Sequence, residues 1–211
     1  MKYQMKTSGK WCGDVPCVND AGAWYEGSFM YHMVALAPLV DTGLCLLRTG
    51  LNLFEDGSSL SKMINIPPRV MMPDTLLPRT NDAHHRWLEG YGWLYEVAYY
   101  GSCIDGTCDL DAGHILAVSR EKYRRERNYN GILFGNFAID EVEPPVESQL
   151  LENTGFAALH QKREQEDNSN DMYYALLDFG PHGGFHGHLV SLGLFCSKST
   201  IHSQFYFYFA V

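Results

Sequence analysis

The sequence lacks both an excess of positive charge and a long apolar run. Its 211 residues carry 16 basic and 25 acidic side chains, which gives a formal net charge of −9. Proteins that hold a nucleic-acid backbone need a basic surface, so this charge argues against a nucleic-acid partner. No apolar run approaches the roughly 20 residues that cross a bilayer, so we expect no membrane span. The first ten residues are polar and show no secretory signal.

Cysteine occurs six times, but never in the C-x2-C spacing of a zinc knuckle. Cys12 and Cys17 form one C-x4-C pair, and Cys103 and Cys108 form a second. We interpret these residues as buried thiols, with disulfide bonds in an oxidising compartment as the alternative. The chain is 45% apolar, which is enough to fold around a hydrophobic core.

The amino-terminal part of the chain has the periodicity of helices. Apolar residues recur at about 3.6-residue spacing over residues 28–47, and Thr49-Gly50 is expected to end that helix. Ser58-Ser59 is expected to cap a second, short helix. That helix should end before Pro67-Pro68, because proline lacks the backbone N–H that a helix needs.

Further along, a polar loop at residues 73–82 leads into a third expected helix, capped by Asp82 and reaching Ala98. Another short helix is expected to begin near Asp111. The joint at residues 140–147 is rich in glutamate and proline, and the periodicity changes after it.

The carboxy-terminal part has the alternation of strands. Strands are expected at residues 155–160, 172–178, 188–195 and 203–211, with a polar turn after the first that is typical of an antiparallel hairpin. Helices followed by strands predict an α+β fold in which the two parts are segregated.

Three histidines lie within seven residues, at His182, His186 and His188, and glycines separate them. If residues 185–189 are extended, His186 and His188 project from the same face. Such a pair can hold one metal ion together, or one histidine can bind the metal while the other transfers protons. This density of histidine is hard to explain by packing, and a glycine- and histidine-rich turn without such a role is the alternative.

Two other stretches carry candidate groups. Residues 24–32 place Tyr31 and His32 at a helix start, where they would offer a phenol and an imidazole to a cleft; core packing is the alternative. Residues 77–82 form a polar loop that a helix N-cap and turn chemistry explain equally well.

Together and in this order, three stretches resemble the heparinase II/III-like polysaccharide lyases, which include oligoalginate lyases. They read W-Y-E-G-S-F-M-Y-H at 24–32, M-P-D-T-L-L-P-R-T-N-D at 72–82 and Y-A-L-L-D-F-G-P-H-G-G-F-H-G-H at 174–188. The resemblance implies the last helices of an (α/α) toroid at residues 1–140. It implies the truncated beginning of an antiparallel β-sandwich at residues 141–211.

The resemblance also implies a reaction, the β-elimination of a uronic-acid glycosidic bond in an acidic polysaccharide such as alginate or a glycosaminoglycan. Tyr31 would be the acid or base, and His186 would act as a base or contact the substrate carboxylate. A tyrosine has an ordinary pKa of about 10, so as a base Tyr31 would need positive charge nearby. His188 would be a ligand of a structural zinc ion. The remaining substrate-binding candidates are Glu26, His32, Asn81 and Asp82.

The chain also departs from the family pattern. The family's asparagine–histidine pair is missing from the 30 residues before Tyr31, and Val190 stands where the family usually has an aspartate. We therefore expect a piece of a longer lyase, with other zinc ligands outside the chain. The alternatives are an inactive relic, a non-catalytic carbohydrate-binding protein, or a metal enzyme built on the three histidines. The family's usual setting is the bacterial periplasm or the cell exterior.

Overall fold

The computed structural model describes residues 17–81, 83–84, 86–103, 115–116, 147–162, 172–179, 191–198 and 201–208. The helices along these residues are α1 (Phe29–Leu47), α2 (Ser59–Val70) and α3 (Gly92–Cys103). Between α2 and α3 lie the short strands β1 (Leu76–Leu77) and β2 (Arg86–Trp87) and the 3-10 helix η1 (Leu88–Tyr91). The later elements are β3 (Gln149–Leu151), the 3-10 helix η2 (Glu152–Thr154), β4 (Phe156–Lys162), β5 (Met172–Asp178), β6 (Ser191–Lys198) and β7 (Ile201–Tyr208). This order confirms the predicted α+β fold.

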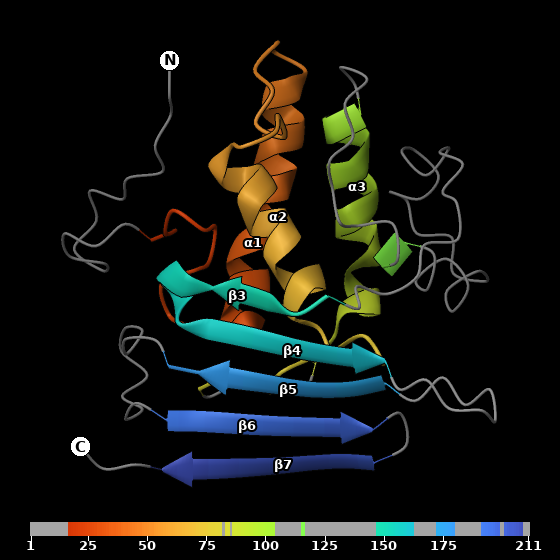
Figure 1. Ribbon diagram of the computed structural model, residues 1–211. Helices are drawn as coiled ribbons and strands as arrows, with labels where there is room; N and C mark the ends of the chain where they lie inside the picture. The colour runs from red at the N-terminus through yellow and green to blue at the C-terminus, as the bar shows by residue number, and fades with distance from the viewer. Residues whose placement is uncertain are drawn as a thin grey trace.

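The strands β3 to β7 form one antiparallel sheet in which each strand pairs with the next along the chain. In Figure 1 the three helices lie beyond the β3 edge of this sheet, and β7 lies farthest from them. The predicted strands at 155–160 and 172–178 correspond to β4 and β5. The strand predicted from residue 188 corresponds to β6, which is described from Ser191, and residues 188–190 lie outside the described residues. With three residues, β3 is too short to show an alternating pattern, and it was not predicted.

Local sequence sets both ends of α1. The side chain of Ser28 accepts a hydrogen bond from the Tyr31 N–H at 3.4 Å, which satisfies one of the free donors of the first turn. After the last turn, the Gly50 N–H donates to the Leu47 carbonyl at 3.1 Å. The predicted helix over 28–47 is therefore confirmed to within one residue.

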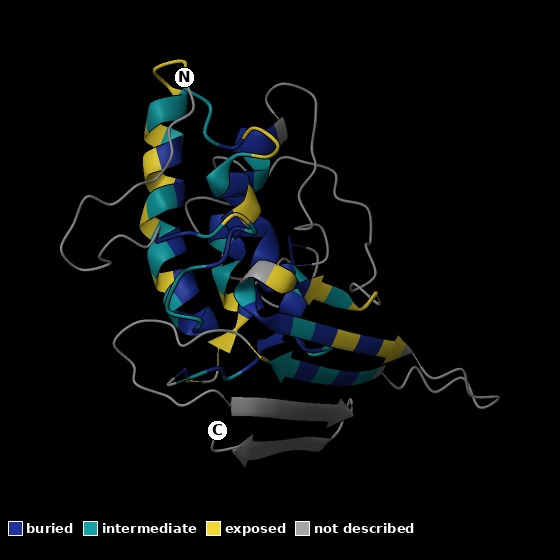
Figure 2. Cartoon of the chain, turned by 60° about the vertical axis from the view of Figure 1, so that its left-hand side comes forward, coloured by how far each residue is buried: buried dark blue, intermediate teal, exposed yellow. Residues whose placement is uncertain are grey.

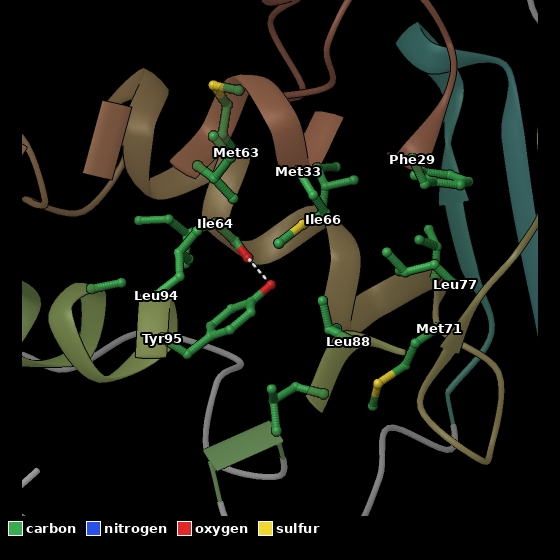
Figure 3. Packing of buried hydrophobic residues seen from close by; sticks show 14 of the residues in the cluster. Phe29, Met33, Met63, Ile64, Ile66, Met71, Leu77, Leu88, Leu94 and Tyr95 are labelled. Atoms are coloured by element: carbon green, nitrogen blue, oxygen red, sulfur yellow. Dashed lines mark hydrogen bonds between the residues drawn. The ribbon is translucent and has the colours of Figure 1, made fainter. Parts of the chain in front are cut away.

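The predicted end of α2 is wrong, because the helix continues through Pro67 and Pro68 to Val70. Each proline lacks the N–H that would bond the carbonyl four residues earlier, at Met63 and Ile64. Both carbonyls instead lie near a buried side chain of another helix. Nε2 of His32 lies 2.9 Å from the Met63 oxygen, and the Tyr95 hydroxyl donates to the Ile64 oxygen at 3.4 Å (Figure 3). These contacts compensate for the bonds that the prolines remove.

At the C-terminal end of α2, side chains of the sheet provide hydrogen-bond partners for two further backbone carbonyls. The Tyr174 hydroxyl of β5 donates to the Val70 oxygen at 2.5 Å, and Nε2 of His160 in β4 lies 3.1 Å from the Met71 oxygen. Helix carbonyls at a buried C-terminus need such partners. These hydrogen bonds connect the end of α2 to β4 and β5.

One hydrophobic core spans the helices and the first strands of the sheet. Figure 2 shows buried residues on the inner sides of the helices and at alternate positions of β4 and β5. The rings of Phe29 and Phe156 lie 4.9 Å apart and join the start of α1 to β4.

Replacing Tyr174 with phenylalanine should lower the free energy of unfolding by about 1–3 kcal/mol, because the buried Val70 carbonyl loses its side-chain donor. The matched control is Tyr173→Phe, at the preceding position of β5, where the side chain is only half-buried. We expect a smaller loss there. Urea denaturation of both variants measures the difference, and equal losses would contradict the role of the Tyr174 hydroxyl.

The helix predicted from Asp82 begins later than expected. The strand β2 and the 3-10 helix η1 occupy residues 86–91, and α3 starts at Gly92. The reason is tertiary, since Leu76 and Leu77 pair with Trp87 and Arg86 in a small antiparallel ladder. Asp82 itself lies outside the described residues, as does most of the helix expected near Asp111.

By length and composition, helix α1 could cross a membrane. The expectation that no apolar segment is long enough for a membrane span therefore does not hold for this helix. This is weak evidence for a membrane span, because the core helix of a soluble protein passes the same test. Met33, Leu36 and Val40 on one side of α1 are fully buried in the protein core. One side of α1 therefore packs in the core, whereas Val34 on this helix is 59% exposed.

Candidate functional site

Two of the three stretches that carry the family resemblance meet at the start of α1. The side-chain amide of Asn81 donates to the Glu26 carbonyl oxygen at 2.9 Å. The Phe29 N–H donates to the Thr80 hydroxyl oxygen at 3.3 Å. Asn81 has a left-handed backbone, with φ of 54°, which asparagine tolerates better than most residues. Residues 24–32 and 72–82 therefore form one local structure.

The described part of the third stretch reaches the same place. Asp178, the last residue of β5, pairs with Phe156 of β4, and Phe156 contacts Phe29 at the start of α1. The Phe179 N–H donates to the Gly155 oxygen at 2.7 Å, which fixes the chain as it leaves β5. His186 and His188 follow this point but lie outside the described residues.

A pocket of about 460 Å³ lies beside this junction. Tyr31 and Glu26, two of the predicted site residues, are in its wall. Other parts of the wall come from Trp24 and from Val34, Ala35 and Leu39 of α1. The volume falls within the range of about 300–1,000 Å³ that is usual for small-ligand sites.

The apolar wall is a feature that the sequence prediction missed. Val34, Ala35 and Pro38 lie three, four and seven residues after Tyr31, so all four residues share one face of a helix. Val34 is 59% exposed, so this face opens to solvent. The spacing was visible in the sequence, but a helical stripe of this kind is more often part of the core.

Tyr25 and Tyr31, the two tyrosines of the first stretch, have different surroundings. The Tyr25 hydroxyl donates to Oε1 of Glu26 at 3.1 Å. Burial, the charge of Glu26 and this hydrogen bond all raise the pKa of Tyr25, so it stays protonated and is a poor base. Tyr31 instead lies in the pocket wall.

His32 is not open to a cleft, which corrects its expected role in substrate binding. The side chain is 1% exposed and both ring nitrogens have backbone partners. Nδ1 accepts the Trp24 N–H at 3.2 Å, and Nε2 lies 2.9 Å from the Met63 oxygen, so the hydrogen is assigned to Nε2. Burial lowers the pKa of His32 to about 4, despite the opposing effect of the Met63 hydrogen bond. The ring is neutral at pH 7 and has a structural role.

Glu26 is the only charged residue among the described residues of the pocket wall. Arg79 belongs to the second stretch, and its Nε donates to the Ala83 oxygen at 3.1 Å. A tyrosine base needs positive charge beside it, whereas a tyrosine acid does not. The described wall residues include no lysine or arginine.

The zinc and cysteine predictions have different outcomes. Within the described ranges, no three His, Cys, Asp or Glu side chains are grouped as metal ligands. His188 lies outside the described residues, so the zinc prediction stays a prediction. Cys17 is 3% exposed and disulfide-bonded, so the interpretation as a buried thiol is wrong for this residue and a disulfide bond is present instead. Cys45 is a free, exposed thiol.

No protein-family model matches the chain, and neither a curated protein nor a solved structure is a significant match. The family resemblance therefore depends on the three sequence stretches.

Proposed function

We propose that this chain carries part of the active site of a heparinase II/III-like polysaccharide lyase, which cleaves uronic-acid-containing polysaccharides by β-elimination. The observation that carries the proposal is the meeting of residues 24–32, 72–82 and 174–178 around the start of α1. These stretches are far apart in the sequence, and a shared site explains why they lie together. Tyr31 and Glu26 line a pocket at this point.

In the proposed reaction a base removes the proton on the carbon beside the uronate carboxylate. The bond from the next carbon to the glycosidic oxygen breaks, a carbon–carbon double bond forms, and the leaving oxygen takes a proton. We assign that last proton to the Tyr31 hydroxyl and the removal of the first to His186. Proton transfer by a positioned side chain typically contributes about 10²–10⁴-fold to the rate.

The finer fold belongs to the same proposal: the helices are the last of an (α/α) toroid and the sheet is one layer of a β-sandwich. The sheet face away from the core is apolar along β3 to β5, at Leu150, Ala157, Leu159, Ala175 and Leu177. Leu150 is 59% exposed and Leu159 is 50% exposed. A solvated sheet face is normally polar, whereas both inner faces of a sandwich are apolar.

A structural zinc ion, held in part by His188, is proposed from the resemblance alone, and the elimination does not pass through it. A periplasmic or extracellular location is likewise proposed. The disulfide bond of Cys17 supports this location, because disulfides persist in oxidising compartments.

The test is to incubate the purified chain with alginate and with hyaluronan and to follow the ultraviolet absorbance of unsaturated uronate ends. Tyr31→Phe should lower the rate at least about 10²-fold, because the phenol proton is lost. Tyr25→Phe is the matched control in the same stretch, and we expect it to keep most of the activity. A rate unchanged by Tyr31→Phe would remove Tyr31 from the mechanism.

The alternative is a non-catalytic carbohydrate-binding protein or inactive relic. It is favoured by the pocket wall, where Trp24 and Tyr31 offer aromatic surface for a sugar and no described side chain neutralises a carboxylate. Binding of uronate oligosaccharides without any ultraviolet-absorbing product would favour this alternative.

A further inference from the structure

Strand β7 forms the edge of the five-stranded sheet on the side away from the helices (Figure 1). Among the strands that the structure describes, it pairs with β6 alone. An edge strand presents a row of backbone N–H and C=O groups along its open side, and another strand can pair with that row. The open side of β7 is therefore a surface for strand addition.

The usual devices that protect a sheet edge do not occur in β7. Such devices are a very short strand, a bulge, a proline or a charged residue. The strand has eight residues, and its ladder with β6 runs without interruption from the Ser191–Tyr208 pair to the Lys198–Ile201 pair. Its sequence, I-H-S-Q-F-Y-F-Y, contains no proline and no Asp, Glu, Lys or Arg. The edge is therefore long, regular and competent for pairing.

The distribution of charge favours a second copy of the chain as the partner. The chain carries a net charge of −9, so two copies repel each other over much of their surface. None of the acidic residues lies in residues 199–211, so two copies can approach at this edge without placing like charges opposite each other. Two identical strands also match when they run antiparallel, because a twofold axis gives both strands the same row of donors and acceptors.

We infer that two copies of this chain pair antiparallel through β7, so that their sheets join edge to edge around a twofold axis. The inference concerns an interface and does not depend on the proposed function. Gln204 lies beside the midpoint of β7. When the pairing is centred on the strand, the axis places position 204 directly opposite, or diagonally across from, position 204 of the second copy. A charge introduced at this position therefore meets the same charge in the second copy.

The experiment measures the mass by light scattering and the dissociation constant of the dimer by sedimentation equilibrium. The wild-type chain should reach twice the 23.9 kDa of one chain. Gln204→Lys alone and Gln204→Glu alone should each raise the dissociation constant at least about fivefold, because like charges then face each other. An equal mixture of the two variants should restore dimerisation, because opposite charges then face each other. Gln161→Lys, at an exposed position of β4, is the matched control and should leave the dissociation constant unchanged.

Four results would overturn the inference. A monomer throughout the concentration series would remove the interface, and an unchanged dissociation constant in Gln204→Lys would place it on another surface. A mixture that dimerises no better than the single variants would show that charge repulsion is not the cause of their defect. A mass above that of two chains would contradict the closed twofold arrangement.

Discussion

Replacing His32 with alanine is expected to lower the free energy of unfolding by about 3–5 kcal/mol. The Met63 oxygen would lose the side-chain partner that compensates for Pro67, and the Trp24 N–H would lose its acceptor. A cavity would also form in the core, because the ring is buried. Urea denaturation measures the loss. A loss below about 1 kcal/mol would show that the prolines in α2 do not depend on His32.

The matched variant is His32→Gln, whose terminal amide can still donate to the Met63 oxygen. We expect a smaller loss than with alanine, because only the acceptor for the Trp24 N–H disappears. Equal losses in the two variants would assign the effect to the lost volume of the ring instead of the hydrogen bond.

The same histidine makes the stability depend on pH. Its pKa is about 4 in the folded chain and about 6.5 when unfolded, so the unfolded state binds the proton more readily between these values. The contribution of His32 to the free energy of unfolding is therefore complete above about pH 6.5. The free energy of unfolding falls by about 3 kcal/mol as the pH drops to 4. His32→Gln removes this contribution. Subtracting its stability curve from that of the wild type isolates His32, and a flat difference would contradict burial of the neutral ring.

Replacing Gly22 with alanine should also cost about 3–5 kcal/mol. Gly22 has a φ of 98°, which a residue with a side chain adopts only under strain, and an added Cβ would lie 2.6 Å from the backbone carbon of Lys62 in α2. That contact is with helix backbone, so it cannot be relieved by turning a side chain. The turn at Gly22 would have to move away from α2.

Gly50 provides the control for Gly22, because its φ of 86° is similar and an added Cβ would meet nothing within 4 Å. Gly50→Ala should cost only the backbone strain, about 1–2 kcal/mol. The difference between the two variants measures the contact between the turn and α2. Thermal or urea unfolding of both is sufficient, and equal losses would contradict the close packing at Lys62.

The sequence stretches predicted the candidate site only in part. The pocket wall contains Tyr31 and Glu26. Asn81 is brought to Glu26 by a hydrogen bond between residues 55 positions apart, which the sequence did not show. His32 follows Tyr31 directly, yet its ring points into the core, because neighbouring helical residues point in directions about 100° apart. The stretch 24–32 contains both residues, but its sequence alone does not show that Tyr31 lines the pocket and that His32 stabilises α2.

What the sequence determined by itself is local. The 3.6-residue periodicity and the Ser28 cap defined α1, and the alternation of apolar residues defined β4 and β5, because these signals depend on neighbours within a few residues. Only the tertiary structure decided that α2 passes through Pro67 and Pro68 and that His32 is structural. The donors that make this helix possible come from His32 and Tyr95, each 31 residues away from its partner in the chain. No local sequence pattern identifies these donors, because the partner of a helix carbonyl that has lost its N–H donor is set by the tertiary fold.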